Sequence, residues 1–96
     1  MIRLDKFLKL SRLVKRRTIA QEMIDVGAVR LNGKKVKPSR DVQEGDELEV
    51  SYARKILTVK VVTADETLLK RRADAYEVLS ETAVLPEPSA EGQKEF

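Results

Sequence analysis

Basic side chains are concentrated in the first part of this 96-residue chain. The first forty residues hold twelve Lys or Arg against three Asp or Glu, a net charge of +9, and seven of those twelve lie in the segment from Arg3 to Arg17. The rest of the chain carries seven basic and thirteen acidic residues, so the overall charge of +3 is the balance of two opposed parts. A dense patch of cations is typical of a surface that binds nucleic-acid phosphate. The sequence therefore predicts a polyanion-binding surface in its N-terminal part.

Three consecutive cations, Lys15, Arg16 and Arg17, stand at the start of an expected helix. A helix N-terminus adds partial positive charge and unpaired N–H groups, so these like charges repel one another unless an anion binds there. An isolated lysine on an exposed helix face is ordinarily just solvated, but the density at this corner favours a phosphate site. The candidate RNA-binding residues are the cations of this stretch and of the segment that follows it: Arg3, Lys6, Lys9, Arg12, Lys15, Arg16, Arg17, Arg30, Lys34, Lys35 and Lys37.

The scarcity of aromatic residues, 4% of the chain, bears on the kind of nucleic acid. It disfavours stacking of bases on an aromatic platform and favours folded RNA recognised by its shape and phosphate positions. Duplex DNA is a weaker alternative, because the second expected helix offers only Gln21 for base edges, and its Glu22 and Asp25 would meet phosphate unfavourably. A protein-interaction module whose basic face meets an acidic partner is a third alternative.

One acidic residue, Asp5, lies inside the basic stretch. A carboxylate near a helix N-terminus complements the helix dipole, which is one interpretation of this position. The other interpretation is an orienting role, in which Asp5 holds Arg3 or Arg17 in place. The two roles are compatible, and the sequence leaves both open.

Residue types that perform catalysis are scarce. The chain has no His and no Cys, which removes the commonest general base, the thiol nucleophile and the commonest zinc ligands. The acids from Asp41 to Glu49 fall in and after an expected turn, where solvation explains them, and the four glycines are isolated. We therefore expect no enzyme activity, no metal site and no cofactor. Because no apolar run approaches the length of about eighteen residues that spans a membrane, we also expect a cytoplasmic protein without membrane contact.

Apolar residues at helical spacing predict short helices over residues 4–11 and 17–26. Thr18 and Gln21 have the separation of a capping box at the start of the second helix, and Gly27 stands where a left-handed residue would end it. Helices this short are unstable alone, so both must pack on another element.

Asn32-Gly33 is the dipeptide that most favours a type I′ turn. Residues 28–31 and 35–37 on either side are therefore predicted to pair as a tight hairpin. Alternating apolar residues predict a further strand over 47–52, after a turn, and a β-branched run predicts another over 56–62.

The C-terminal segments are assigned from spacing and composition. Residues 66–82 have an apolar pattern near the helical period, which predicts a C-terminal helix, whereas residues 86–96 have the composition of a disordered acidic tail. We thus expect an α+β fold, in which two short N-terminal helices pack on a small, mostly antiparallel β-sheet. The expected divisions are a binding domain over 1–62, a helical extension over 63–85 and the tail.

These features together resemble the S4 RNA-binding domain family. The matching residues are Arg3 to Leu8, Arg17, Ala20, Ile24, Gly27, Val29, Asn32-Gly33, Val36, Pro38-Ser39 and Gly45-Asp46. The resemblance covers residues 2–52 and implies an S4-like fold that binds structured RNA across its helices and hairpin. Through Ser11 to Thr18 and Ala75-Tyr76, the chain is similar to stand-alone S4 proteins of ribosome-associated quality control. Heat-shock S4 proteins usually carry a long basic C-terminal extension, whereas this chain has a short acidic one.

The resemblance also implies a function. The protein would bind ribosomal RNA of the large subunit and peptidyl-tRNA on obstructed large subunits, and would assist a tailing factor, a protein partner that adds C-terminal residues to the nascent chain without a template. A heat-shock type factor that rescues dissociated large subunits is the alternative. By the same resemblance Arg3 and Arg17 would be the main RNA contacts. The cations around them would be Lys6, Arg12, Lys15 and Arg16. We expect a monomer.

Overall fold

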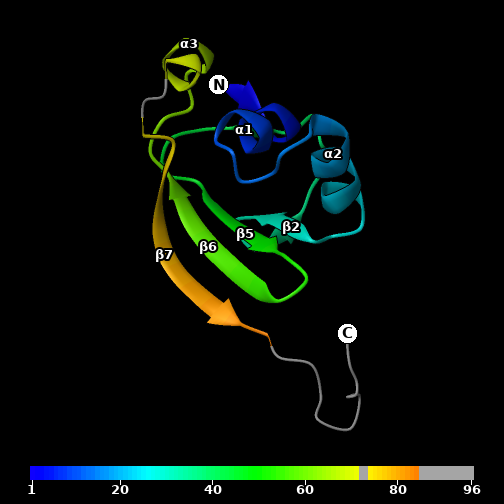
Figure 1. Cartoon of the computed structure of the whole chain (residues 1–96). Coiled ribbons are helices and arrows are strands. Elements are labelled where there is room, and N and C mark those ends of the chain that lie inside the picture. The colour runs from blue at the N-terminus through cyan, green and yellow to red at the C-terminus, as the bar shows by residue number, and fades with distance from the viewer. Residues whose placement is uncertain (72–73, 85–96) are drawn as a thin grey trace, which may run out of the picture.

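The computed structural model describes residues 1–71 and 74–84, which form an α+β fold as predicted (Figure 1). In chain order the elements are β1 (Ile2–Arg3), α1 (Leu4–Leu10), α2 (Arg17–Asp25), β2 (Val29–Leu31), β3 (Lys34–Lys35), β4 (Asp41–Val42), β5 (Glu47–Ser51), β6 (Lys55–Val61), α3 (Glu66–Lys70) and β7 (Tyr76–Ala83). The two N-terminal helices and strands β2, β3, β5 and β6 lie close to their expected ranges, whereas the short strands β1 and β4 were not predicted. Within these described residues, no helix has both the length and the apolar character needed to cross a membrane.

Five strands form one antiparallel sheet in the order β3-β2-β5-β6-β7, and β1 pairs separately with β4. Side chains alternate across β5, where Leu48 and Val50 are fully buried while Glu47 and Glu49 are exposed. This alternation places one face of the sheet against the helices and leaves the other in solvent. The register Val29 to Val50 aligns the buried positions of neighbouring strands.

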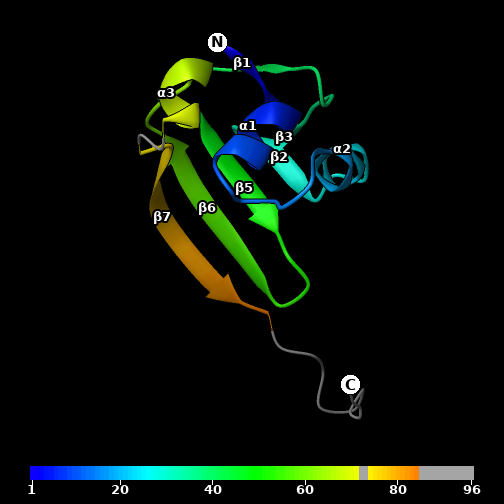
Figure 2. The same ribbon diagram turned by 45° about the horizontal axis from the view of Figure 1, so that its top comes forward.

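The core lies between this sheet and the pair α1 and α2, which Figure 1 shows side by side at one end of the sheet. Phe7 and Leu8 of α1 and Ile24 of α2 have no exposed surface. Burying a large apolar side chain contributes about 1.5 to 3 kcal/mol, which compensates for the weakness of helices of seven and nine residues. Figure 2 shows the short β1 leading directly into α1, so the first helix is fixed at its start.

The hairpin prediction is confirmed in its backbone angles. Asn32 and Gly33 have φ of +51° and +81°, both positive as a type I′ turn requires. The Asn32 side chain also accepts a hydrogen bond from the backbone N–H of Glu47 at 2.9 Å, which ties the turn to β5. Gly27, with φ of +80°, follows α2 as the predicted left-handed residue.

The prediction of a helix over residues 66–82 is wrong beyond residue 70. There α3 ends, and β7 pairs along β6 from Val61 opposite Tyr76 to Lys55 opposite Ala83. The physical reason is the free edge of β6, whose unpaired backbone groups are satisfied by a strand and would be left to solvent by a helix. In the described part of the predicted helical extension, residues 63–71 and 74–84, the structure has one short helix and one long strand. The predicted tail, 86–96, lies outside the described residues.

Candidate nucleic-acid interface

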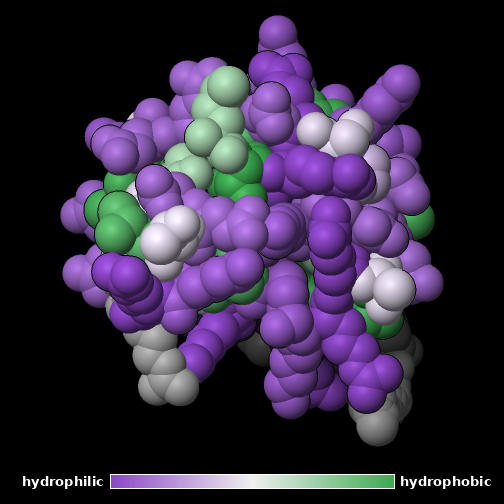
Figure 3. All heavy atoms as spheres, turned by 90° about the horizontal axis from the view of Figure 1, so that it is seen from above, coloured by the Kyte–Doolittle hydropathy of each residue, from purple (hydrophilic) through white to green (hydrophobic). Residues whose placement is uncertain are grey.

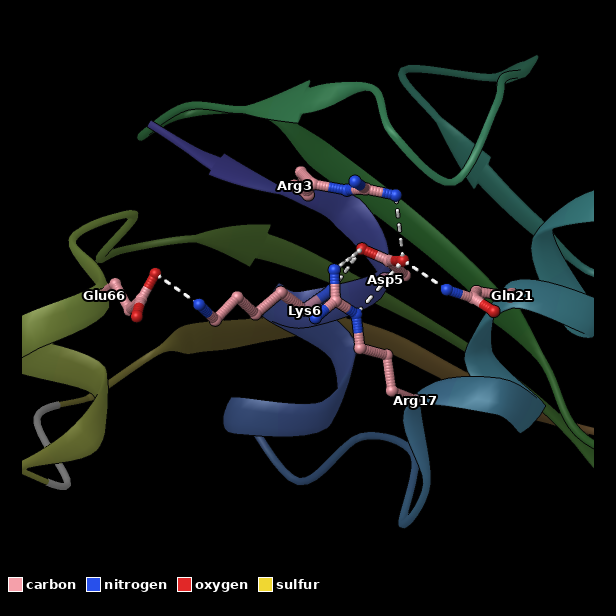
Figure 4. Close-up of polar contacts among 6 residues, drawn as sticks. All are labelled: Arg3, Asp5, Lys6, Arg17, Gln21 and Glu66. Carbon is pink, nitrogen blue, oxygen red and sulfur yellow. Dashed lines mark hydrogen bonds and ion pairs between the residues drawn. The ribbon is translucent and has the colours of Figure 1, made fainter.

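The first turn of α1 contains Asp5, a charged residue with no exposed surface. Its Oδ1 accepts the backbone N–H of Lys6 at 2.7 Å, and its Oδ2 accepts Nε2 of Gln21 at 2.8 Å. The same Oδ2 lies 3.2 Å from Nε of Arg17 and 3.4 Å from Nη2 of Arg3. Figure 4 shows the three side chains converging on this carboxylate. One buried acid therefore joins β1, α1 and α2.

The protonation of Asp5 follows from two opposed influences. Burial acts most strongly and raises the pKa, because it disfavours the charged form. Hydrogen bonds from Gln21 and Arg17, together with the charges of Arg17 and Arg3, outweigh burial and hold the pKa of Asp5 below its ordinary value. Asp5 is therefore a carboxylate at neutral pH.

The capping-box prediction for Thr18 and Gln21 is wrong. The N-cap of α2 is Arg16, and no side chain bonds the free N–H groups there. Gln21 instead donates to Asp5, because a buried carboxylate is a stronger acceptor than the groups a capping Gln would meet. The sequence suggests Gln21 only as a capping residue or a reader of DNA bases, and no local pattern connects it with a residue sixteen positions away.

Arg3 and Arg17 are anchored at one end and open at the other. Their side chains are 48% and 42% exposed, while the carboxylate that both contact is fully buried. A guanidinium has five N–H donors in a planar fork, so each arginine keeps donors for a ligand after meeting Asp5. Asp5 therefore holds the two guanidinium groups next to each other, although Arg3 belongs to β1 and Arg17 to α2.

The two helix N-termini next to this anchor differ. In α1, the N–H groups of Leu4 and Asp5 donate to the carbonyls of Arg40 at 2.8 Å and Pro38 at 3.2 Å, so they are already satisfied. In α2, no acceptor within the described chain meets the N–H groups from Arg17 to Ile19. The start of α2 therefore offers unpaired donors and partial positive charge beside Arg17.

Lys6 is held apart from the two arginines. Its Nζ lies 2.7 Å from Oε1 of Glu66 in α3, and Lys70 reaches the other oxygen of Glu66 at 3.0 Å. Hydrogen bonds from Lys6, and then from Lys70, lower the pKa of Glu66. Figure 4 shows Lys6 pointing away from Asp5 toward Glu66. Sequence reasoning missed this pair, because Glu66 lies sixty positions further along the chain.

The corner between α1 and α2 brings together Arg12, Lys15 and Arg16. Their side chains have no ion pair among residues 1–71 and 74–84. Tyr52 supports this corner, since its hydroxyl donates to the carbonyl of Leu13 at 2.6 Å. Lys9, also without an ion pair in that part of the chain, lies nearby in a groove of about 670 Å³ between α1 and α3. The predicted cations of the corner are thus close together and uncompensated.

The hairpin cations form a second group, namely Arg30, Lys34, Lys35 and Lys37, which are all exposed. Arg30 lies directly opposite Lys35 across the hairpin, so two like charges are adjacent. The stem of Lys35 passes Gly27, just beyond the C-terminal end of α2. Because α2 has nine residues, about 13 Å of helix separates this group from Arg17. The structure therefore places the hairpin cations beyond the C-terminal end of α2, apart from Arg17 and the corner at its N-terminal end.

The helical end of the molecule is largely hydrophilic, as Figure 3 shows from above, with a few separate apolar areas. Within the described ranges, no three acidic side chains lie close enough together to hold a metal ion. The arrangement can hold anions through guanidinium forks, ammonium groups and free helix N–H groups. It is suited to binding phosphates at several fixed positions.

Comparison with known proteins identifies the family. The S4 domain family matches residues 2–48. A relative from Bacillus subtilis (strain 168), named RQC P-site tRNA stabilizing factor, is 48% identical over 81 residues, which cover 83% of this chain and 94% of that protein. A Streptococcus pneumoniae relative of the same name is 44% identical over 84 residues, 86% of this chain and 96% of that protein.

Two further matches carry a different name, Heat shock protein 15. Heat shock protein 15 of Escherichia coli (strain K12) is 33% identical over 95 residues, which cover 97% of this chain and 71% of that protein. A trimeric structure of Vibrio cholerae Heat Shock Protein 15 matches with a TM-score of 0.70 and 25% identity over 82% of each chain. These sequence matches, together with the shared fold, show that the chain belongs to the S4 domain family, among relatives named RQC P-site tRNA stabilizing factor.

Proposed function

We propose that this protein is an RNA-binding factor of ribosome-associated quality control. It binds ribosomal RNA and peptidyl-tRNA on obstructed large subunits and assists the template-free tailing of the nascent chain by a partner protein. The name shared by the relatives that are 48% and 44% identical supports the tRNA part of this proposal. The absence of His and Cys from the sequence supports a role in binding, with the chemistry left to the ribosome.

The observation that carries the proposal is the pair Arg3 and Arg17 on the buried carboxylate of Asp5. An arginine that is already oriented loses less side-chain entropy when it binds a ligand, so more of the contact energy appears as affinity. The free N–H groups at the start of α2 add donors in the same place. The protein would act as a clamp that fixes RNA phosphates, and Asp5 would be the orienting residue.

The other cations would surround this clamp. Lys6, Lys9, Arg12, Lys15 and Arg16 would contact neighbouring phosphates, and the hairpin group beyond the far end of α2 would contact a second stretch of RNA. We propose that the protein acts in the cytoplasm as a monomer. Because the structure of the Vibrio cholerae relative is trimeric, sedimentation of this protein alone is the direct test of its oligomeric state.

A second candidate is a heat-shock type factor that rescues dissociated large subunits. The match with Escherichia coli Heat shock protein 15 over nearly the whole chain favours it. The two functions differ in their ligand. A quality-control factor should bind large subunits that carry peptidyl-tRNA more tightly than empty ones and should co-purify with the tailing partner, whereas the rescue factor should bind dissociated subunits carrying a nascent chain without that partner.

Co-sedimentation with purified large subunits, with and without peptidyl-tRNA, tests the proposal through Arg17. Arg17→Ala should weaken binding by about 1 to 3 kcal/mol, the value of a charge-assisted contact, and Arg17→Lys should restore part of it, because an ammonium lacks the planar fork. Lys60→Ala is the matched control, since Lys60 is an exposed cation of β6 flanked in register by Glu47 and Glu77. Circular dichroism must show that each variant is folded.

The salt dependence of the same binding adds a second test. If about five cations meet phosphates, the logarithm of the affinity should fall with the logarithm of salt concentration with a slope of roughly −3 to −5. A slope near zero, or an Arg17→Ala variant that binds as well as Lys60→Ala, would show that this surface does not hold RNA.

A further inference from the structure

A groove of about 560 Å³ lies beside the proposed clamp, between the corner that joins α1 to α2 and the first turns of α2. Its lining is Arg12, Leu13, Val14, Lys15, Arg16, Ile19, Met23 and Tyr52. This volume is within the range of about 300 to 1,000 Å³ typical of pockets that hold small organic groups. No acidic side chain lines it.

The floor of the groove is apolar and well supported. Leu13 and Val14 are more than nine-tenths buried, and Ile19 is 44% exposed at the open side. The hydroxyl of Tyr52 is occupied by its hydrogen bond to Leu13, which fixes the ring against the corner. Burial, and then the neighbouring Tyr76, raise the pKa of Tyr52, so its hydroxyl keeps the proton that it donates. The floor is therefore an apolar surface that is held in place by Tyr52 and is open to solvent at Ile19.

The rim of the groove is positively charged. The cations Arg12, Lys15 and Arg16 line the groove and have no ion pair in the described parts of the chain. A fourth cation, Lys55, lies with its Nζ 5.5 Å from the centre of the Tyr52 ring. An apolar floor lined also by three cations that have no ion pair in the described residues is complementary to a ligand with an apolar body and anionic groups.

The backbone of Arg12 gives a separate indication that the rim is functional. Arg12 has φ of +68°, in the left-handed region just beyond the end of α1, where glycine or asparagine is the usual residue. A non-glycine residue in this conformation is one of the strained backbone features that cluster at functional sites.

We propose that this groove takes one unpaired base of the bound RNA, with the apolar floor contacting the base and the rim cations holding the phosphates before and after it. The proposal rests on the RNA-binding function above and extends it, because the clamp alone reads phosphate positions whereas the groove selects RNA with an unstacked nucleotide. Arg16 and Arg17 are consecutive, so groove and clamp are continuous and one RNA strand can meet both. The base would therefore contact a mostly aliphatic surface that includes one tyrosine, Tyr52. This differs from the aromatic platform that the sequence disfavours.

An acidic amphipathic peptide is the competing occupant. One observation favours the nucleotide. The groove is lined by Arg16, the residue next to Arg17 of the clamp, so a strand held by the clamp lies beside the groove.

The test compares two RNA hairpins that differ by a single unpaired adenosine in the stem. Their affinities for the full chain are measured by fluorescence anisotropy at one fixed salt concentration. Stacking of one base on an aromatic side chain is worth about 1 to 3 kcal/mol, so a groove with one tyrosine should make the wild type bind the bulged hairpin about five-fold more tightly. Ile19→Ser should reduce this preference to near one and leave the affinity for the paired hairpin within about two-fold, because the phosphate contacts are unchanged.

The control is Val26→Ser, which makes a similar change at a residue 77% exposed beyond the C-terminal end of α2. It should keep the preference of the wild type. Arg17→Ala separates the two proposals, because it should weaken both hairpins equally through the loss of a phosphate contact. Equal affinity of the wild type for both hairpins, or an intact preference in Ile19→Ser, would overturn the groove proposal even while Arg17→Ala still weakens binding. If the wild type has no preference and an acidic amphipathic peptide binds instead, the groove is a protein-docking site.

Discussion

Replacing Asp5 by Asn is the most informative perturbation of the site, because the change keeps the shape of the side chain and removes its charge. Asp5 is fully buried and accepts two short hydrogen bonds, from the backbone N–H of Lys6 at 2.7 Å and from Gln21 at 2.8 Å. An asparagine keeps one acceptor oxygen and places an NH₂ group where the other stood. That NH₂ would face the N–H groups of Arg17, a contact between donors that cannot bond, and Gln21 could bond it only by turning its own amide so that its oxygen accepts.

The magnitude follows from the contacts. A hydrogen bond to a charged group contributes about 1.5 to 3 kcal/mol and one between neutral groups about 0.5 to 1.5 kcal/mol, so both bonds become weaker when the carboxylate is replaced by a neutral amide. The contacts to Arg3 and Arg17, at 3.4 and 3.2 Å, involve side chains almost half exposed, so solvent screening leaves them with a small share. The neutral asparagine avoids the cost of burying the Asp5 charge, which offsets part of the lost stability. We expect Asp5→Asn to destabilise the fold by about 2 kcal/mol, which for a chain of this length lowers Tm by about 8 to 16 °C.

The loss should depend on pH with a defined sign. The pKa of Asp5 is lower in the folded protein than its ordinary value of about 3.9, so the folded state favours the ionised form. The stabilisation is therefore fully present above that ordinary pKa and is lost as the pH falls through the lower, folded pKa. The difference in stability between the wild type and Asp5→Asn should be constant from pH 7 to about pH 5 and should shrink below about pH 4.

Urea unfolding followed by circular dichroism measures this difference at each pH. Asp25→Asn is the matched control, since Asp25 is an exposed acid at the end of α2 with no ion pair in the described structure. It should change stability by less than about 0.5 kcal/mol. If Asp5→Asn costs no more than Asp25→Asn at pH 7, or if its cost does not decline in acid, the carboxylate is not the structural anchor described above.

Two further predictions concern positions with positive φ. Gly33→Val should destabilise the fold by about 1 kcal/mol or more in urea unfolding, because Gly33 has φ of +81°. No atom lies within 4 Å of an added Cβ, so the cost comes from the backbone alone. Lys34→Val is the control, and equal stability of the two variants would mean that the turn tolerates a β-branched residue. Arg12→Gly should stabilise the fold by about 0.5 to 1 kcal/mol, because glycine relieves the left-handed strain at φ of +68°. The same variant should bind large subunits more weakly in co-sedimentation. A variant that is less stable than the wild type, or that binds as well, would contradict a functional reason for Arg12.

Local patterns were sufficient where neighbours in sequence decide the conformation. Asn32-Gly33 predicted a type I′ turn because few other residues adopt two successive positive φ angles, and both angles are positive in the structure. Gly27 marked the end of α2 for the same reason. The alternation in β5 predicted which side chains are buried, since one face of the sheet must cover the core.

Local patterns failed where a distant partner decides. The segment of β7 has apolar residues near helical spacing, but β6 offers an unpaired edge, and pairing along seven register positions outweighs a weak periodic preference. Gln21 likewise has the spacing of a capping residue, yet it bonds Asp5 across two helices. The charge count predicted a cationic surface, but it could not show that the cations are held by different acids or that the hairpin group stands apart from the clamp.

That difference between the acids gives the cations different roles. Asp5 is buried with no exposed surface, so a phosphate cannot replace it, and Arg3 and Arg17 meet RNA with their anchor in place. Glu66 has a side chain 38% exposed, so a phosphate can take its place beside Lys6. Lys6 would then join the surface only by exchanging a carboxylate for a phosphate, a contact that gains little net affinity because one ion pair replaces another. The affinity of the proposed clamp should therefore depend far more on Arg3 and Arg17 than on Lys6, although all three carry the same charge in the same short segment of sequence.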